Sequence, residues 1–156
     1  MRLYLVQHGD AVAKEVDPDR PLSEQGMKDA VRTASFLKRA GVRVSRVIHS
    51  GKKRAEDTAE LLATATAPGK KPESVPGLDP FYPPEGLAQK IAHWKEDTMV
   101  VGHLPYLEKL VSRLLTGRQA PGVVAFTPGS VLCLERDEDG SWKLLWMIRP
   151  DLLGGS

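Results

Sequence analysis

The sequence contains a single cysteine, Cys133, among its 156 residues. One cysteine cannot form an internal disulfide, and its place in the apolar run from Val131 to Leu134 predicts a small buried side chain. The lack of disulfides is typical of a protein kept in a reducing compartment. No stretch approaches the ~18 apolar residues of a membrane span, and Gln7 and His8 interrupt the only apolar run near the start. We therefore expect a cytoplasmic protein.

Charge of either sign is not in large excess, and aromatic residues are few. The chain has 22 Lys and Arg residues against 20 Asp and Glu residues, a net charge of +2, and 6% aromatic residues. A nucleic-acid-binding domain usually presents a basic face, so nucleic acid is not an expected partner. A chain of this length, 41% hydrophobic, can bury one sizeable core without metal or disulfides. We find no internal repeat and expect residues 1–156 to form a single domain.

Strand-like and helix-like segments alternate along the chain. Ser23 is a good helix N-cap and Gly41 a helix stop; between them, apolar residues recur at helical spacing, namely Met27, Ala30, Val31, Ala34 and Leu37. Further helices are expected over 52–67, 85–95 and 107–115. Strands are expected over 2–6, 46–49, 73–75, 98–103, 123–126, 130–135 and 142–148, and the turn 137–140 joins the last two as a hairpin. This order predicts an α/β three-layer sandwich, in which a mostly parallel central sheet has helices on both faces and ends in a β-hairpin.

Polar residues follow three of the predicted strands at the point where each strand ends. The first strand is followed by Gln7 to Asp10, the second by His49 and Ser50, and a later one by Gly102 to Leu104. Ligands of open α/β sheets bind beyond the carboxyl ends of the strands. We therefore expect these residues, which are far apart in sequence, to meet at one edge of the sheet.

The residue types at this edge favour an anion. Gly9 permits a sharp turn and a close approach of a ligand to the backbone. The basic run from Lys52 to Arg54 begins a predicted helix, where unpaired N–H groups and the helix dipole already attract negative charge. His8 and His103 converge with Arg54 on that helix start, and this combination suits a phosphate.

Three separated motifs resemble those of the histidine phosphatase superfamily, most closely its small SixA-type phosphohistidine phosphatase branch. They are Gln7-His8-Gly9-Asp10-Ala11, then Ser50 with Arg54-Ala55 and Thr58, and finally Val101-Gly102-His103-Leu104-Pro105. The similarity also includes Pro21-Leu22-Ser23 before the first helix and extends to the helix after His103. It implies a phosphoglycerate mutase-like fold and a phosphatase that needs neither a metal nor another cofactor.

The resemblance assigns roles to the matching positions. His8 corresponds to a nucleophile that becomes phosphorylated, Arg54 to an arginine that grips the phosphoryl oxygens, and His103 to the second histidine of the phosphate pocket. These three are the expected catalytic residues. The expected phosphate-binding set is Gln7, Gly9, Arg54, His103 and Leu104.

Gln7 departs from the family pattern, because the family motif usually begins Arg-His-Gly. The amide of Gln7 can donate hydrogen bonds to a phosphoryl oxygen, but it brings no charge and cannot form the bidentate charged fork of arginine. Lys52, Lys53 or a protonated His103 are the candidates for the missing charge.

No residue stands out as the general acid that alkyl phosphate hydrolysis requires. Asp10, Asp79 and Glu85 are candidates, although Glu85 is more simply explained as an acidic residue in the first turn of its helix. A phosphohistidine substrate makes less demand on such an acid. The short connection from Val75 to Glu85 also leaves no room for a helical roof, which suits a phosphate displayed on a protein. The expected partner is thus a phosphorylated protein or a small phosphorylated substrate.

Two other readings remain open. The departure at Gln7 is compatible with a catalytically weakened module that binds phosphate or phosphohistidine without turning it over. His8, His49 and His103 could also form a metal site, but their spacing matches no short zinc motif and His49 is expected to alternate away from the pocket.

Overall fold

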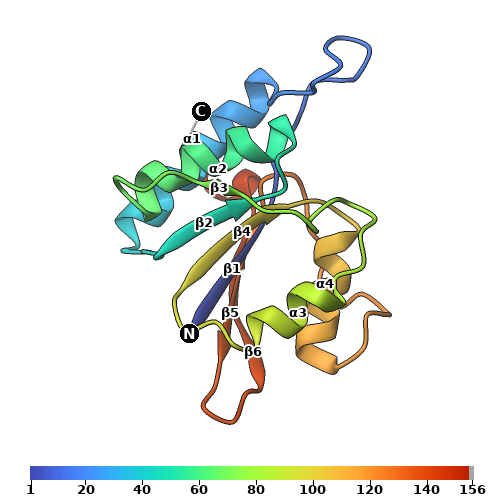
Figure 1. Cartoon of the computed structure of the whole chain (residues 1–156). Coiled ribbons are helices and arrows are strands. Elements are labelled where there is room, and N and C mark those ends of the chain that lie inside the picture. Colours follow the sequence, from blue (N-terminus) through green and yellow to red (C-terminus); the bar gives the residue numbers. More distant parts are fainter. Residues whose placement is uncertain (155–156) are drawn as a thin grey trace.

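The computed structural model describes residues 1–154 and is built around one mixed β-sheet (Figure 1). Its strands are β1 (Arg2–Gln7), β2 (Arg46–His49), β3 (Glu73–Ser74), β4 (Thr98–Gly102), β5 (Val131–Arg136) and β6 (Trp142–Ile148). Its helices are α1 (Glu24–Arg39), α2 (Lys53–Thr66), α3 (Glu85–Ile91) and α4 (Tyr106–Thr116), followed by a short 3₁₀ turn over Pro150–Leu152. None of the helices in residues 1–154 is long and apolar enough to cross a membrane.

The strand order of the sheet is β3-β2-β4-β1-β5-β6. The first four strands in this order run parallel, whereas β5 and β6 form an antiparallel hairpin on the far side of β1. The registers pair Gln7 with Gly102 and His49 with Val101. The carboxyl ends of β1, β2 and β4 therefore lie together at one edge of the sheet, as the strand-end motifs predicted.

Helices cover both faces of the sheet, which gives the predicted three-layer sandwich. Helices α1 and α2 pack on one face with Tyr4, Val6 and Val101, and Cys133 is buried in the same cluster. Helices α3 and α4 pack on the other face, which carries Leu5 among its buried residues. Figure 1 shows the two helical layers on opposite sides of the strands. The phosphoglycerate mutase-like α/β prediction is thus confirmed at the level of layers and topology.

Helix α1 begins and ends as predicted but buries a different face. The hydroxyl of Ser23 accepts a hydrogen bond from the Gly26 N–H, and Gly41 follows the helix with a φ of +75°. The buried stripe is Gly26, Ala30, Thr33, Ala34 and Leu37. Met27 and Val31 are 51% and 55% exposed, so not all of the apolar residues at helical spacing lie on the buried face. The stripe is shifted because the helix packs against the backbone that leaves β1, where a small residue is needed.

That backbone contact lies at Gly26. A Cβ built on Gly26 would overlap the carbonyl oxygen of Asp10 and lie 3.0 Å from its backbone nitrogen. Ser23 secures the same contact, since its N–H donates to the Asp10 carbonyl (2.9 Å) and its hydroxyl donates to the Asp10 carboxylate (2.6 Å). The first turn of α1 therefore sets the position of the chain directly after His8.

Two other element predictions need correction. Residues 123–126 form no strand; the buried ring of Phe126 instead joins the core beside α3 and α4. Helix α3 ends at Ile91 rather than at residue 95. The chain tightens there, since the N–H groups of His93 and Trp94 bond carbonyls three residues back. Trp94 then lies under the guanidinium of Arg46, 4.5 Å from its ring centre.

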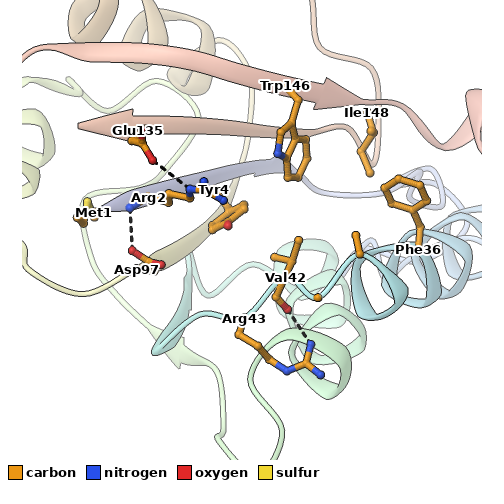
Figure 2. Close-up of a pocket in the computed structure, with 12 residues that line it drawn as sticks. Met1, Arg2, Tyr4, Phe36, Val42, Arg43, Asp97, Glu135, Trp146 and Ile148 are labelled. Carbon is orange, nitrogen blue, oxygen red and sulfur yellow. Dashed lines mark hydrogen bonds and ion pairs between the residues drawn. The ribbon is translucent and has the colours of Figure 1, made fainter. Parts of the chain in front are cut away.

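A pocket of about 660 Å³ opens at the opposite end of the sheet from the strand-end motifs (Figure 2). Its charged groups already have partners: the Arg2 side chain pairs with Glu135 (3.2 Å), and the Arg2 N–H donates to Asp97 (2.7 Å). Arg43 donates to the carbonyl of its own neighbour, Val42 (2.9 Å). This pocket shares no lining residue with the strand-end motifs and is not part of their site.

Candidate active site

His8 stands immediately after β1, and its ring is held by one hydrogen bond. The ring Nδ1 lies 2.7 Å from the carbonyl oxygen of Gly9, and the backbone N–H of His8 donates to the carbonyl of Gly102 (3.0 Å). A carbonyl oxygen can only accept, so Nδ1 carries the proton and Nε2 carries the lone pair. The ring is partly exposed. His8 is therefore prepared as a nucleophile at Nε2, and the carbonyl of Gly9 is the orienting group.

Gly9 connects this turn to α2. Its N–H donates to the hydroxyl of Thr58 (3.0 Å), and that hydroxyl donates to the carbonyl of Arg54 one turn earlier (2.8 Å). A Cβ on Gly9 would lie 3.1 Å from Leu22 and 3.3 Å from the Gly26 carbonyl, so the fit is tight. The turn that carries His8 and the helix that carries Arg54 are thus held in one arrangement.

His103 follows β4 and faces the ring of His8. The two ring centres are 5.0 Å apart, at an interplanar angle of 55°. His103 Nε2 lies 2.6 Å from the hydroxyl of Ser50, which in turn accepts from the Lys52 N–H (3.3 Å). The other ring nitrogen, Nδ1, is buried and has no partner in the described chain. Three strand ends therefore contribute to one cluster, as predicted.

Arg54 lies in the first turn of α2, and its charge is not neutralised within the protein. Its Nε is buried without a hydrogen-bond partner, and no carboxylate of residues 1–154 lies within 4.0 Å of it. Lys52 stands at the N-cap position of the same helix and makes no side-chain cap. A buried donor without a partner costs about 1–3 kcal/mol, so the Nε of Arg54 at this helix start favours an anionic ligand.

Gln7 and Leu104 complete the predicted set. The side chain of Gln7 is buried, and its Oε1 has no partner. Rotation of the amide by 180° would place the NH₂ group there instead, and the orphan acceptor would become a donor. The side chain of Leu104 packs on the core, while its backbone N–H makes no hydrogen bond in the described part of the chain. Only the backbone of Leu104 is thus available to a ligand.

Both histidines are neutral under ordinary conditions. Burial lowers the pKa of His8 to about 4, and the charges of Arg54 and Arg20 act in the same direction, against the hydrogen bond to Gly9. Burial lowers the pKa of His103 to about 3, and repulsion from a protonated His8 and from Arg54 adds to the effect. A neutral imidazole is the form that can attack phosphorus.

Comparison with known proteins agrees with this geometry. The model of the histidine phosphatase superfamily, branch 1, matches residues 3–81, which is half of the chain and includes His8 and Arg54. The chain belongs to the histidine phosphatase superfamily. It is 28% identical to the phosphohistidine phosphatase SixA of Escherichia coli strain K12, over 96% of this chain and 94% of that protein.

Solved structures show the same relationship. A structure of the protein histidine phosphatase SixA complexed with tungstate superposes with a TM-score of 0.86 and 26% identity, covering 99% of this chain and all of that chain (100%). A phosphoglycerate mutase from Plasmodium falciparum, 22% identical, has the same fold with a TM-score of 0.66 over 93% of this chain and 88% of that one. The SixA-type branch of the histidine phosphatases is thus the one that this chain resembles, in sequence and in fold.

Other residues singled out from the sequence lie outside the histidine phosphatase cluster. His49 is buried, and its Nδ1 accepts a hydrogen bond from the Gly51 N–H (3.0 Å), which closes the turn after β2. Glu85 forms a bidentate ion pair with Arg113 (2.8 and 3.0 Å) between α3 and α4, and this bond holds the pKa of Glu85 below its usual value. No group of three or more His, Cys, Asp or Glu side chains within residues 1–154 could hold a metal ion.

The structure excludes two of the candidates for the positive charge that Gln7 does not provide. Lys53 is paired with Asp57 (2.7 Å), and His103 is neutral, so neither is a free cation. The charge that sequence reasoning missed is that of Arg20, in the loop between β1 and α1, which acts on both histidines and on Arg54. Only its place just before the Pro21-Leu22-Ser23 motif could have drawn attention to it.

We predict that His8 and His103 stay neutral well below the ordinary titration range of histidine. Because their pKa values are lowered to about 4 and about 3, the imidazoles should take up protons only as the pH falls through those values. NMR titration of the ring C–H signals, assigned with His8→Ala and His103→Ala, measures the midpoints. A midpoint near ~6.5, the ordinary value for histidine, for either residue would contradict the prediction.

Proposed function

We propose that residues 1–156 form a single phosphatase domain that hydrolyses phosphohistidine on a protein, through a phosphoryl intermediate on His8. The observation that carries this proposal is the Nδ1 hydrogen bond of His8 to the Gly9 carbonyl (2.7 Å), which leaves Nε2 as the nucleophilic atom. A histidine held in this tautomer, with positive charge nearby and an open face, suits in-line attack on phosphorus.

The proposed reaction has two displacements. In the first, the lone pair of His8 Nε2 forms a bond to phosphorus while the P–N bond to the substrate imidazole breaks, and that imidazole leaves after protonation. In the second, water attacks the phosphoryl group, and inorganic phosphate and neutral His8 are regenerated. Arg54, His103 and the amide of Gln7 stabilise the equatorial oxygens, together with backbone N–H groups that include Leu104. We propose no metal and no other cofactor for either step.

The carboxylates near the edge favour a P–N substrate. Glu85 is committed to Arg113, and the Asp10 carboxylate accepts the hydroxyl proton of Ser23 (2.6 Å). Neither is free to serve as a dedicated acid for an alkoxide leaving group, which alkyl phosphate hydrolysis requires. Asp79, the third candidate, is exposed in the segment after Val75, where its carbonyl accepts from the Tyr82 N–H, and nothing in residues 1–154 holds its carboxylate toward His8. An imidazole leaves readily once protonated, so phosphohistidine makes the smaller demand on this site.

The open edge favours a substrate displayed on another protein. The segment from Val75 to Pro84 contains no helix, and Phe81 and Tyr82 in it are 86% and 56% exposed. No helical layer therefore covers the pocket from this segment. The similarity to proteins named as phosphohistidine phosphatases supports the same substrate class.

The second candidate is a module that binds phosphohistidine or phosphate with little or no turnover. Its motivation is Gln7, whose buried, uncharged amide stands where the family has arginine. A module of this kind would bind phosphate but would show no catalytic turnover in either of the displacements above.

We predict that a phosphohistidine-bearing phosphotransfer protein is the preferred substrate. Its kcat/KM should exceed those of p-nitrophenyl phosphate and glucose 6-phosphate by about 100-fold, because its leaving group needs little acid catalysis. Initial rates for the three substrates, each with and without EDTA, measure this directly. Faster hydrolysis of the sugar phosphate would contradict the substrate class, loss of activity in EDTA would contradict the metal-free step, and no turnover of any substrate would favour the binding module.

A further inference from the structure

Arg20 is held in a backbone conformation that arginine rarely adopts. Its φ is +48°, and no other non-glycine residue of the described chain has a positive φ. This conformation costs a non-glycine residue roughly 1–2 kcal/mol, and such residues cluster at functional sites. Glycine would fit the backbone here without strain, so what arginine adds at this position is its side chain.

The loop that carries Arg20 is fixed at its base. The Val12 N–H donates to the Pro21 carbonyl (3.0 Å), and the Leu22 N–H donates to the carboxylate of Asp57 on α2 (3.2 Å). Nε of Arg20 donates to the Val12 carbonyl (3.1 Å), which aligns the guanidinium along the loop. These bonds attach the loop to the helix whose first turn carries Arg54.

A cavity of about 390 Å³ separates this loop from the start of α2. Pro18 and Asp19 line it on the loop side, and Gly51 to Arg54 line it on the helix side. Arg20 is the next residue along the loop. Arg54 lines this hollow on the helix side, and the loop that carries Arg20 lines it on the other side.

Within residues 1–154, neither guanidinium is neutralised by a carboxylate. No carboxylate in residues 1–154 lies within 4.0 Å of Arg20 or Arg54. The charge of Arg20 lowers the pKa of Arg54, as well as those of His8 and His103. Two nearby cations without a counterion repel each other, and a shared anion relieves that repulsion.

We propose that Arg20 is a phosphate-binding residue of this site, and that it contributes the positive charge that Gln7 does not. It would bind the phosphoryl oxygens from the loop side while Arg54 binds them from the helix side, so that the pair replaces an arginine before His8. The inference rests on the proposed phosphatase function of the same pocket.

The first test measures the binding of inorganic phosphate by calorimetry, which requires no turnover. Arg20→Gly removes the side chain and relaxes the backbone, so we expect a 10- to 100-fold weaker affinity, the worth of a charge-assisted contact. Lys14→Gly removes an exposed cation from the same loop. It should leave the phosphate affinity within about twofold, since an exposed charge is screened by solvent. Wild-type affinity in Arg20→Gly would overturn the inference.

The second test moves the charge. Gln7→Arg should restore phosphate affinity and kcat/KM for p-nitrophenyl phosphate at least tenfold in the Arg20→Gly background, but change the wild-type protein much less. The same gain in both backgrounds would mean that the two positions act independently, and would overturn the inference. Inactivity of every variant and of the wild type, with the phosphate affinities behaving as expected, would instead refute the proposed phosphatase function alone.

A third test compares two variants and separates the effect of the charge from an effect on folding. Arg20→Lys keeps the positive charge on the same backbone, and Arg20→Gln removes it while keeping a similar length. If Arg20 only closes the loop through its bond to Val12, the two variants should bind phosphate equally weakly. The inference predicts that Arg20→Lys binds at least fivefold more tightly than Arg20→Gln, and equal affinities would overturn it.

Discussion

Replacing His8 with alanine should lower kcat/KM for p-nitrophenyl phosphate and for phosphohistidine by at least about 10⁴-fold, since loss of a catalytic nucleophile costs this much or more in other enzymes. Without the Nε2 lone pair no covalent intermediate can form, and Arg54 and His103 can only bind the substrate. The side chain is partly exposed and makes one hydrogen bond, to its neighbour Gly9. The folded structure should therefore survive, and the loss should appear in kcat.

His93→Ala is the matched control for this variant. His93 is exposed in the turn after α3, on the opposite face of the sheet from α2, and it takes part in that turn through its backbone N–H. Its replacement should leave kcat/KM within about twofold, as for a surface residue away from the site. Retention of wild-type rates by His8→Ala would refute nucleophilic catalysis by His8, whatever the substrate.

Gly26→Ala should destabilise the protein by roughly 2–4 kcal/mol, which corresponds to a fall of about 5–15 °C in Tm for a chain of this length. The new methyl group would overlap the Asp10 carbonyl, which is backbone and cannot move without moving the turn at His8 and Gly9. The remaining folded protein should therefore also lose phosphatase activity, because the Gly9 bond to Thr58 is displaced. Thermal unfolding and kcat/KM measured on the same sample report both effects.

Gly86→Ala provides the control. Gly86 is also helical, in α3, but a Cβ there would meet nothing within 4 Å. Alanine is favoured over glycine in helices by up to about 1 kcal/mol, so this variant should be as stable as the wild type or slightly more so. Equal stability of the Gly26 and Gly86 variants would contradict the tight contact between α1 and the turn after β1.

The edge of the sheet was predictable from the sequence because it depends on strand order and strand ends alone. Short apolar segments that end in Gln7-His8-Gly9, His49-Ser50 and Gly102-His103 are buried parallel strands, and parallel strands present their carboxyl ends together. These features are local, so one sequence is enough to find them.

The features that could not be predicted depend on contacts between distant segments. The buried face of α1 is set by the approach of Asp10 to Gly26, and this turns Met27 and Val31 outward. The apolar pattern at 123–126 resembles a strand, but Phe126 packs into the core beside α3 and α4 instead of joining the sheet. The periodicity of apolar residues in a sequence indicates which face of a helix or strand is buried. It does not indicate which other segment packs against that face.

The position of Arg20 is the clearest example of such a contact. An arginine in a polar loop with two prolines reads as a solvated surface residue. Its relation to the site depends on a positive φ and on the bonds that attach the loop to α2. Neither is encoded in residue spacing.

Direct observation of the phosphorylated enzyme tests the nucleophile most directly. The protein is mixed with a phosphohistidine-bearing protein or p-nitrophenyl phosphate, quenched in alkaline detergent and analysed by ³¹P NMR and mass spectrometry. Because Nδ1 is engaged by the Gly9 carbonyl, we expect phosphorus on Nε2 of His8, formed and lost at rates consistent with turnover. Turnover without any phosphorylated His8, or phosphorus on Nδ1 or on another residue, would contradict the role assigned to His8.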